Sequence, residues 1–319
     1  MLTFPIIALS ASADDLKRLQ QSPYVADIIE DNMNFPLTLT ASVNKIGGNA
    51  GWALGYTGAG QTVAVIDNGV DKNHPYLINK VVKEACFSTT SKAQKVTSSC
   101  RKKGSRDTKT GAASLTCKFQ DFACTHGTLL ASLAAGNSGQ AGFAGSGVAP
   151  SANIIAVKVD SLIKNKRVCG STTPCSVFFD SDLLRGLEFV YKQRNAFRIA
   201  AANVSIGGSS SPKTCKKSPI KKTVAKLRKA GIATLAATGN DGFNNKLSTP
   251  ACVDGVIAIG ASTDTDTVAP FTNSASKLAL LAPGFNIGLA MPGVNLPGFE
   301  VVASGTSLSA ALATGAWAA

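Results

Sequence analysis

The sequence predicts an α/β fold in which helices cover both faces of a doubly wound, mainly parallel sheet. Uninterrupted apolar runs of strand length recur along the chain, as expected for strands that are buried on both faces. Helical patterns separate some of these runs, and this alternation is typical of right-handed βαβ units. The predicted strands are 61–67, 154–159, 200–206, 232–237 and 256–259, and the clearest helical pattern between them is 182–191.

The first 35 residues are expected to form a separate element. The expected pieces are a strand at 4–10, a helix at 13–20 and a second strand at 25–32. A competing interpretation takes 6–13 as a signal peptide with Ala11-Ser12-Ala13 as its cleavage site. That segment has no basic residues before it and only a short apolar core, so we favour the separate element.

Asp67 stands at the carboxyl end of the strand predicted at 61–67 and is followed by Asn68-Gly69. Open α/β sheets place their functional groups at the carboxyl ends of their strands. Asp67 is therefore a candidate site residue, and an ordinary turn aspartate is the alternative for this segment taken alone.

Residues 84–124 form a long insertion that is rich in Ser, Thr, Lys and Gly and carries four cysteines. A structureless loop of this length inside a compact domain needs to be tied down. Pairing Cys86 with Cys100 and Cys117 with Cys124 would do so, although the sequence does not fix the connectivity.

The eight cysteines of the chain predict an oxidising, extracytoplasmic compartment. None forms a Cys-x-x-Cys pair, and with only two histidines the chain offers poor material for a zinc site. Four disulfides are the preferred interpretation, and free buried cysteines are the alternative. Since no apolar stretch reaches about 18 residues, no membrane span is expected.

His74 and His126 are the only histidines. His74 precedes Pro75, which biases its backbone toward an extended or turn conformation, and we interpret it as structural. His126 opens a helix of small residues, with Thr125 as the expected N-cap and Gly136 as the stop signal. A histidine at the start of a closely packed helix is held still, as a general base must be.

The net charge of +13 does not by itself predict nucleic-acid binding. The basic residues of 218–231 alternate with apolar ones at helical spacing, so they are expected to form the solvated face of a helix. Ser218 and Pro219 suit its start, and Gly231 suits its end. Because few aromatic residues accompany these charges, we expect no specific nucleic-acid partner, only weak attraction to acidic surfaces.

Ser307 lies in Gly305-Thr306-Ser307, between an extended segment at 301–303 and an Ala- and Leu-rich run that continues to Trp317. Glycine allows a tight turn here, and a helix N-terminus favours developing negative charge. Taken alone, the motif is also an ordinary helix cap. The candidates nevertheless follow the order Asp, His, Ser, which is the subtilisin order and not that of chymotrypsin or the α/β-hydrolases.

Four segments carry a resemblance to subtilisin-like serine proteases, and this resemblance covers essentially the whole chain. These segments are Ala64-Val65-Ile66-Asp67-Asn68-Gly69, His126-Gly127-Thr128, Leu235-Ala236-Ala237-Thr238-Gly239-Asn240-Asp241-Gly242 and Gly305-Thr306-Ser307. The resemblance implies a secreted serine endopeptidase with Asp67, His126 and Ser307 as its triad. It also implies that the side chain of Asn240 donates a hydrogen bond to the oxyanion.

The same resemblance implies a polypeptide substrate that pairs in extended form with the protein. The residues implied to line the substrate site are Ser205, Ile206 and Gly207 on one side and Ala237, Thr238 and Gly239 on the other. The chemistry then needs no cofactor, and a monomer is expected. Calcium is common in the family, but its ligands are not identified in this sequence.

Residues 1–35 resemble the C-terminal half of a subtilisin-type propeptide, a folding chaperone and inhibitor, and 36–319 resemble the catalytic domain. Only positions 308–319 follow Ser307, so the resemblance predicts a C-terminally truncated catalytic domain. Disulfides Cys169–Cys175 and Cys215–Cys252 are expected, the second by resemblance to a family bridge. A cis peptide bond at Thr249-Pro250 is expected on the same ground.

The sequence departs from the family motifs at Thr125, Leu129 and Ala311-Leu312. The family usually has aspartate, a second histidine and Pro-His at these places. None is a triad member. Two alternatives therefore stay open, namely a catalytically silent protein of this fold that only binds peptides or partners, and a different serine hydrolase such as an esterase.

Overall fold

The computed structural model describes residues 11–25, 28, 39–101, 104–115, 122–139, 145–170, 173–208, 215–290 and 300–319. The chain divides into two compact units, Met1–Phe35 and Pro36–Ala319. In the first unit, the expected helix is α1 (Ala13–Gln20), which begins with a capping box between Ser12 and Asp15. The strand expected at 4–10 lies outside the described residues, and so does nearly all of the one expected at 25–32.

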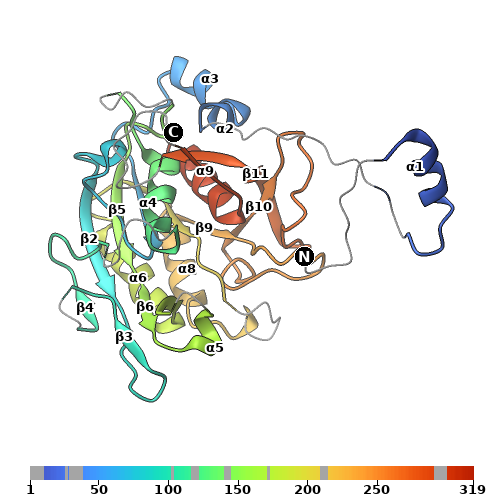
Figure 1. Ribbon diagram of the computed structural model, residues 1–319. Helices are drawn as coiled ribbons and strands as arrows, with labels where there is room; N and C mark the ends of the chain where they lie inside the picture. Colours follow the sequence, from blue (N-terminus) through green and yellow to red (C-terminus); the bar gives the residue numbers. More distant parts are fainter. Residues whose placement is uncertain are drawn as a thin grey trace. The chain divides into compact units, whose positions relative to one another are not determined.

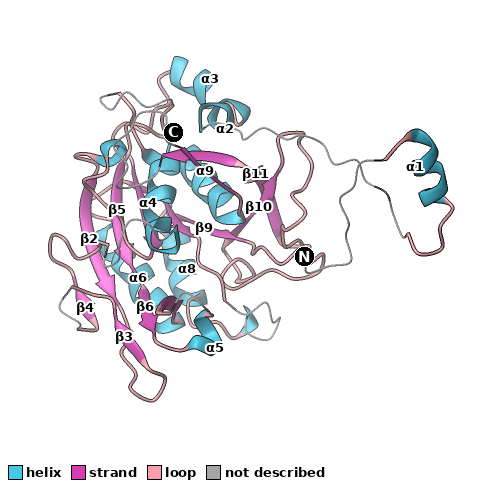
Figure 2. Ribbon diagram, in the orientation of Figure 1, coloured by secondary structure: helices cyan, strands magenta, loops and turns pink. Residues whose placement is uncertain are grey.

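The second unit is built on a sheet whose described strands follow the order β11-β10-β9-β8-β1-β5-β2-β4 (Figures 1 and 2). Their bounds are β1 (Thr62–Asp67), β2 (Val81–Phe87), β4 (Arg106–Asp107), β5 (Asn153–Lys158), β8 (Ile199–Val204), β9 (Ala233–Ala237), β10 (Ile257–Ser262) and β11 (Leu278–Pro283). The pairs are parallel except β2 with β4. All five predicted strands are confirmed, while β2 and β11 join the same sheet without having been predicted.

The central strand β1 alternates its side chains between two hydrophobic cores. Val63 and Val65 pack in one core, and Ala64 and Ile66 pack in the other. Every residue of β1 is buried, because helices cover both faces of the sheet. The strand therefore reads as a continuous apolar run rather than as an alternating one.

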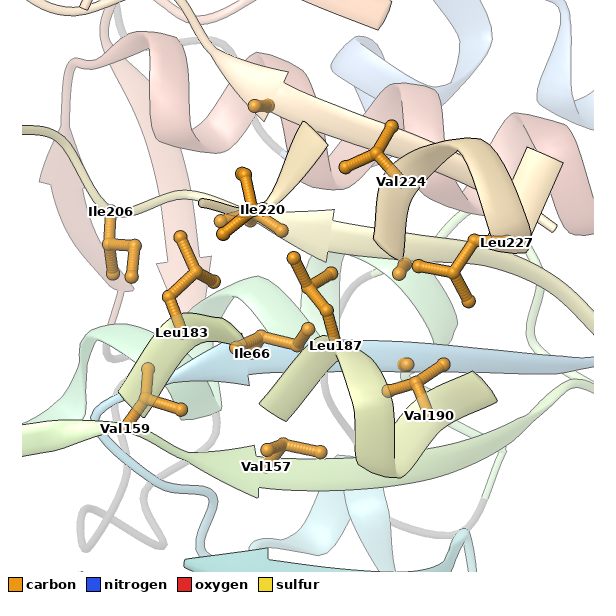
Figure 3. Packing of buried hydrophobic residues seen from close by; sticks show 14 of the residues in the cluster. Ile66, Val157, Val159, Leu183, Leu187, Val190, Ile206, Ile220, Val224 and Leu227 are labelled. Carbon is orange, nitrogen blue, oxygen red and sulfur yellow. The ribbon is translucent and has the colours of Figure 1, made fainter. Parts of the chain in front are cut away.

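Helices α4 (Phe122–Ala135) and α9 (Thr306–Ala318) cover the face of Val63 and Val65. Helices α6 (Asp180–Gln193) and α8 (Lys221–Lys229) cover the other face. Figure 3 shows this second core, in which Leu183 and Leu187 of α6 meet Ile66 while Val224 and Leu227 lie on α8. The basic residues of α8 form its exposed face, as predicted from their spacing.

The prediction that Thr125 caps the His126 helix is wrong. Helix α4 begins at Phe122, so Thr125 lies inside it and is fully buried. Thr125 can cap a helix, which is why the helix was expected to start there. The three residues before it are not helix breakers, so the helix can begin one turn earlier. The stop at Gly136 is confirmed.

The insertion at 84–124 is more ordered than the loop that was predicted. Its start belongs to β2, β4 extends the main sheet, and β3 (Val96–Ser98) joins β6 (Asp160–Ile163) and β7 (Cys175–Phe178) in a separate antiparallel sheet of order β3-β6-β7. The pairing of β3 is made with a strand that lies beyond the insertion, which local composition does not reveal.

The two expected disulfides Cys169–Cys175 and Cys215–Cys252 are confirmed, with Cα–Cα separations of 5.5 and 5.6 Å. Cys86 is bonded to Cys100 at a Cα–Cα separation of 5.7 Å, which is one of the pairings that the sequence left open. The predicted pair Cys117–Cys124 lies outside the described residues, since Cys117 is not among them. The cis bond at Thr249-Pro250 is confirmed, and Thr173-Pro174 is cis as well.

The remaining described elements are α2 (Leu39–Lys45), α3 (Gly48–Ala53), η1 (Pro75–Leu77), α5 (Lys166–Cys169) and the antiparallel pair β12 (Ile287–Ala290) and β13 (Glu300–Ala303). Within the described residues, none of the helices combines the length and apolarity that a membrane crossing needs.

Candidate active site

Asp67 and His126 meet at the carboxyl end of β1. Nδ1 of His126 lies 2.9 Å from Oδ1 of Asp67, and the two residues are 59 positions apart in the sequence. Asp67 is 1% exposed, whereas the His126 side chain keeps 21% of its surface exposed. The geometry pairs a buried carboxylate with an imidazole that remains accessible to solvent.

The turn after Asp67 holds this pair from both sides. The backbone N–H of Asn68 donates to Oδ1 of Asp67 at 2.8 Å, and Oδ1 of Asn68 accepts from the N–H of Gly127 at 2.9 Å. Asn68 thus binds the strand that carries the aspartate to the helix that carries the histidine. The sequence interpretation treated Asn68 only as a break after the strand.

Gly127 is required because α4 approaches the β1 turn very closely. A Cβ at this position would overlap the carbonyl oxygen of Gly69 and lie 3.0 Å from the Cβ of Asp67. Helix and turn can therefore meet only through a residue without a side chain.

We expect Gly127→Ala to push α4 away from β1 and to lengthen the contact between His126 and Asp67. A displacement of this kind can lower turnover by about 100-fold, because a general base works only within hydrogen-bond reach. The measurement is kcat per titrated active site. Gly136→Ala, at the far end of the same helix, also creates a backbone overlap and is the matched control. It should cost stability but leave kcat unchanged, and an equal loss in both variants would contradict this account.

The environment favours the protonated form of His126. Burial opposes the charge, but the negative charge of Asp67 and its hydrogen bond outweigh burial and raise the pKa of His126 above the ordinary value of 6.5. A base with a raised pKa is strong, yet it is available only once it has lost its proton.

The raised pKa predicts the pH dependence of activity. Since His126 must be neutral to accept a proton, kcat/KM should rise with pH through a midpoint above 6.5. Imidazole signals in an NMR titration should give the same pKa, and with two histidines the His74→Gln variant identifies the His126 signals. A midpoint below 6.5 by both methods would contradict the pairing with Asp67.

Ser307 is the second residue of α9, and Ser304 and Gly305 connect this helix to the end of β13. Its side chain is partly exposed, and its hydroxyl donates to the carbonyl oxygen of Ser205 at 3.2 Å. Oγ of Ser205 donates back to the carbonyl oxygen of Ser307 at 3.1 Å. The two serines therefore fasten the start of α9 to the carboxyl end of β8.

Asn240 is held beside the same helix start by Thr306. Its Oδ1 accepts both the backbone N–H and the hydroxyl of Thr306, each at 2.9 Å, so its amide nitrogen is left as the outward donor. A Cβ on Gly305 would lie 3.5 Å from Nδ2 of Asn240 and 3.8 Å from N of Ser307. Two N–H donors thus flank the space over Gly305.

A buried asparagine that the sequence interpretation missed, Asn273, shapes the loop of Asn240. Its Oδ1 accepts from the N–H groups of Asp241 and Phe243 at 3.0 and 3.1 Å. It lies so close to Gly239 that a Cβ there would overlap its amide nitrogen. No local motif surrounds Asn273, whose only sequence signal is an amide between apolar segments.

The six residues predicted to bind substrate lie at the carboxyl ends of the neighbouring strands β8 and β9. Gly207 is exposed and Gly239 is partly exposed, whereas the side chains of Ile206 and Thr238 are buried. Ile206 packs in the core of Figure 3, so only its main chain is available to a ligand. Gly207 and Gly239 leave main chain accessible beyond the carboxyl ends of β8 and β9, as a site that binds the main chain of a peptide would need.

Among the described residues, no cluster of three or more His, Cys, Asp or Glu side chains is arranged to hold a metal ion. The calcium ion that the family resemblance allows is therefore not assigned to any residues.

Asp67, His126, Asn240 and Ser307 follow one another in this order along a chain that folds into a mainly parallel sheet. Known proteins share these features. A model described as the Subtilase family matches residues 58–319. The chain belongs to the subtilase family.

The sequences of other subtilases agree with this assignment. Subtilisin E of Bacillus subtilis is 29% identical over 294 residues, which cover 90% of this chain and 64% of that protein. The subtilisin-like serine protease Pen c 1 of Penicillium citrinum is 35% identical over 188 residues, covering 58% of this chain and 40% of that protein. The chain thus spans less than two thirds of the length of these relatives.

Solved structures share the fold. A cold-adapted subtilisin-like serine proteinase superposes with a TM-score of 0.54 at 25% identity, covering 81% of this chain and 74% of that one. A psychrophilic protease gives a TM-score of 0.59 at 24% identity, covering 82% and 76%.

The positions at which this subtilase departs from the usual motifs are all buried in helices. Thr125 and Leu129 lie in α4, and Ala311 and Leu312 lie in α9, each at most 1% exposed. None of the four carries a charge, so no buried charge is left without a partner. The four positions therefore lie in the packed interior of the two helices that carry His126 and Ser307.

Proposed function

We propose that this chain is the catalytic part of a secreted serine endopeptidase, with Asp67, His126 and Ser307 as its triad. One observation carries the proposal: Oδ1 of Asp67 lies 2.9 Å from Nδ1 of His126 at the carboxyl end of β1. Ser307, at the start of α9, contacts the carboxyl end of the neighbouring strand β8. Membership of the subtilase family supports the same reaction class.

The mechanism is acyl transfer through a covalent serine ester. The Ser307 hydroxyl turns from the Ser205 carbonyl toward Nε2 of His126, which removes its proton as the oxygen attacks the scissile carbonyl. Asp67 keeps the Nδ1 proton in place and stabilises the imidazolium, which then protonates the leaving amine. Water repeats the sequence on the ester and releases the acid.

Asn240 and the backbone N–H of Ser307 stabilise the oxyanion in this proposal. Thr306 supports the role of Asn240, because its two hydrogen bonds fix Oδ1 and leave Nδ2 as the donor. The cost of losing such an asparagine, about 10²–10³ in kcat, is a value measured in a subtilisin. The dipole of α9 adds positive potential at the same point.

The substrate is an extended polypeptide in this proposal. The exposed main chain of the segments that follow β8 and β9 supports it, because backbone groups beyond the ends of the strands can form hydrogen bonds with a peptide backbone. The disulfides support an extracytoplasmic location. We further propose that residues 1–35 derive from an inhibitory propeptide and that the protease acts as a monomer without a cofactor.

A fluorophosphonate probe tests the proposal against a silent protein of the same fold. The protein should be labelled once per chain, with mass mapping placing the label on Ser307. Hydrolysis of a peptide anilide with weaker turnover of a simple aliphatic ester would then favour a peptidase over an esterase. Absence of labelling in folded protein would overturn the catalytic proposal.

A further inference from the structure

A buried lysine lies directly beside the Asp67 turn. Lys158 is the last residue of β5 and is the register partner of Asp67 in the parallel pair of β1 and β5. It is only 1% exposed, although lysine is almost never buried without a partner. The sequence showed it as a single charge at the end of an apolar strand.

The ammonium group of Lys158 binds the turn that carries the aspartate. Nζ donates to the carbonyl oxygen of Asn68 at 2.9 Å, and a Cβ on Gly69 would lie 3.5 Å from Cδ of Lys158. Asn68 is the residue whose N–H contacts Asp67 and whose side chain contacts Gly127. The contact with Asn68 is therefore one residue away from both members of the Asp67–His126 pair.

Asp160 supplies the counter-charge. Its Oδ1 lies 3.5 Å from Nζ of Lys158, and the aspartate is 2% exposed. Burial raises the pKa of Asp160, while Lys158 and the hydroxyls of Ser99 and Ser176 counteract that rise. Ser99 donates to Oδ1 at 2.8 Å and Ser176 to Oδ2 at 3.1 Å.

Each of these serines adjoins a disulfide. Ser99 precedes Cys100 of the Cys86–Cys100 bridge, and Ser176 follows Cys175 of the Cys169–Cys175 bridge. The segments that these two disulfides close therefore both contact Asp160 through a serine. Asp160 pairs with Lys158, and Lys158 binds the turn that follows Asp67.

We propose that Lys158 is a positioning residue for the Asp67–His126 pair, acting through the Asn68 carbonyl and held in place by Asp160. This inference rests on the proposed function. A buried ion pair adds little net stability compared with apolar residues of the same volume, so fold stability alone is a weak reason for its presence. Its hydrogen bond to the Asn68 carbonyl gives it a role in aligning Asp67 with His126.

Lys158 on β5 and Asp160 on β6 lie beside the turn that follows Asp67, and the backbone N–H of Asp71, beyond that turn, donates to the hydroxyl of Thr128 on α4. Lys158 is the cation among them that binds the turn.

The test is the kinetics of Lys158→Met, with kcat expressed per site titrated by the fluorophosphonate and a peptide anilide as substrate. We expect kcat to fall about 10- to 100-fold with KM within about twofold, because a misplaced base slows the chemical step and leaves peptide binding intact. Titration removes misfolded protein from the comparison. A kcat per site equal to that of the parent would overturn the inference.

Lys80→Met is the matched control. Lys80 is also buried, its Nζ also donates to a backbone carbonyl, that of Pro150 at 2.7 Å, and burial lowers its pKa to about 8. Its own carbonyl accepts from Ile154, near the start of β5, about 13 Å along the strand from Lys158. This variant should lose stability with kcat per site unchanged.

A second variant keeps the inference testable if Lys158→Met does not fold. Lys158→Met combined with Asp160→Asn removes the ion pair without leaving an unpaired buried charge, so the protein should fold. Its kcat per site should fall as in the single variant, and a parent-like kcat would refute the positioning role. If the parent itself is not labelled by the fluorophosphonate, the proposed function fails instead, and the two failures are distinct.

Discussion

Ser307→Ala should abolish both turnover and fluorophosphonate labelling. The substitution removes the oxygen that would form the acyl bond and leaves the rest of the site in place, since the main chain of Ser307 still accepts from Ser205. In a subtilisin, loss of the corresponding serine costs about a millionfold in kcat, and a similar loss is expected here.

Labelling in gel and hydrolysis of a peptide anilide measure this effect. Thermal unfolding of the variant should match that of the parent within a few degrees, because Ser307 is partly exposed and a surface substitution changes stability little. Turnover above the residual level that the oxyanion donors alone provide would remove Ser307 from the mechanism.

His126→Ala should be about as damaging as the loss of Ser307, since the nucleophile then has no base. The two groups act as one unit, so adding Ser307→Ala to His126→Ala should cost little more. The comparison that decides the assignment is with the other histidine of the chain.

His74→Ala is the control for this prediction. His74 is 2% exposed, its Nδ1 accepts from the N–H of Tyr76 at 3.3 Å, and its ring stacks on that tyrosine. Its loss should lower the unfolding temperature and leave kcat per titrated site largely intact. If His74→Ala were inactive and His126→Ala active, the assignment of the base would be wrong.

The sequence identified the strands and helices whose burial is uniform. The run before Asp67 is apolar because helices pack on both faces of the sheet. The run after His126 is apolar because α4 is packed between β1 and α9, so in both cases local composition indicates the fold directly. The basic helix α8 was predicted as well, because its charged residues stay exposed while Val224 and Leu227 enter the core.

Contacts between distant polar residues could not be predicted in the same way. Asn68, Asn273 and Lys158 act through hydrogen bonds to backbone groups 30 to 90 positions away. Such bonds depend on which strands become neighbours, and no single segment of the sequence predicts the strand order β8-β1-β5. The ordered insertion was missed for the same reason, since the partner of β3 is β6, a strand that lies beyond the insertion in the sequence.

The position of β1 between β5 and β8 has a consequence for synthesis. β1 is the earliest of the three strands in the chain, yet its two neighbours begin 91 and 137 residues later, at Asn153 and Ile199 compared with Thr62. α9, which carries Ser307 and packs against α4, is later still. Contacts of such long sequence separation form slowly, because the entropy of closing large loops must be overcome first. During translation the nascent chain therefore carries Asp67 and His126 before Ser307, the nucleophile that we propose, has been made. The triad of the proposal can form only in a late step, after most of the sheet has left the ribosome.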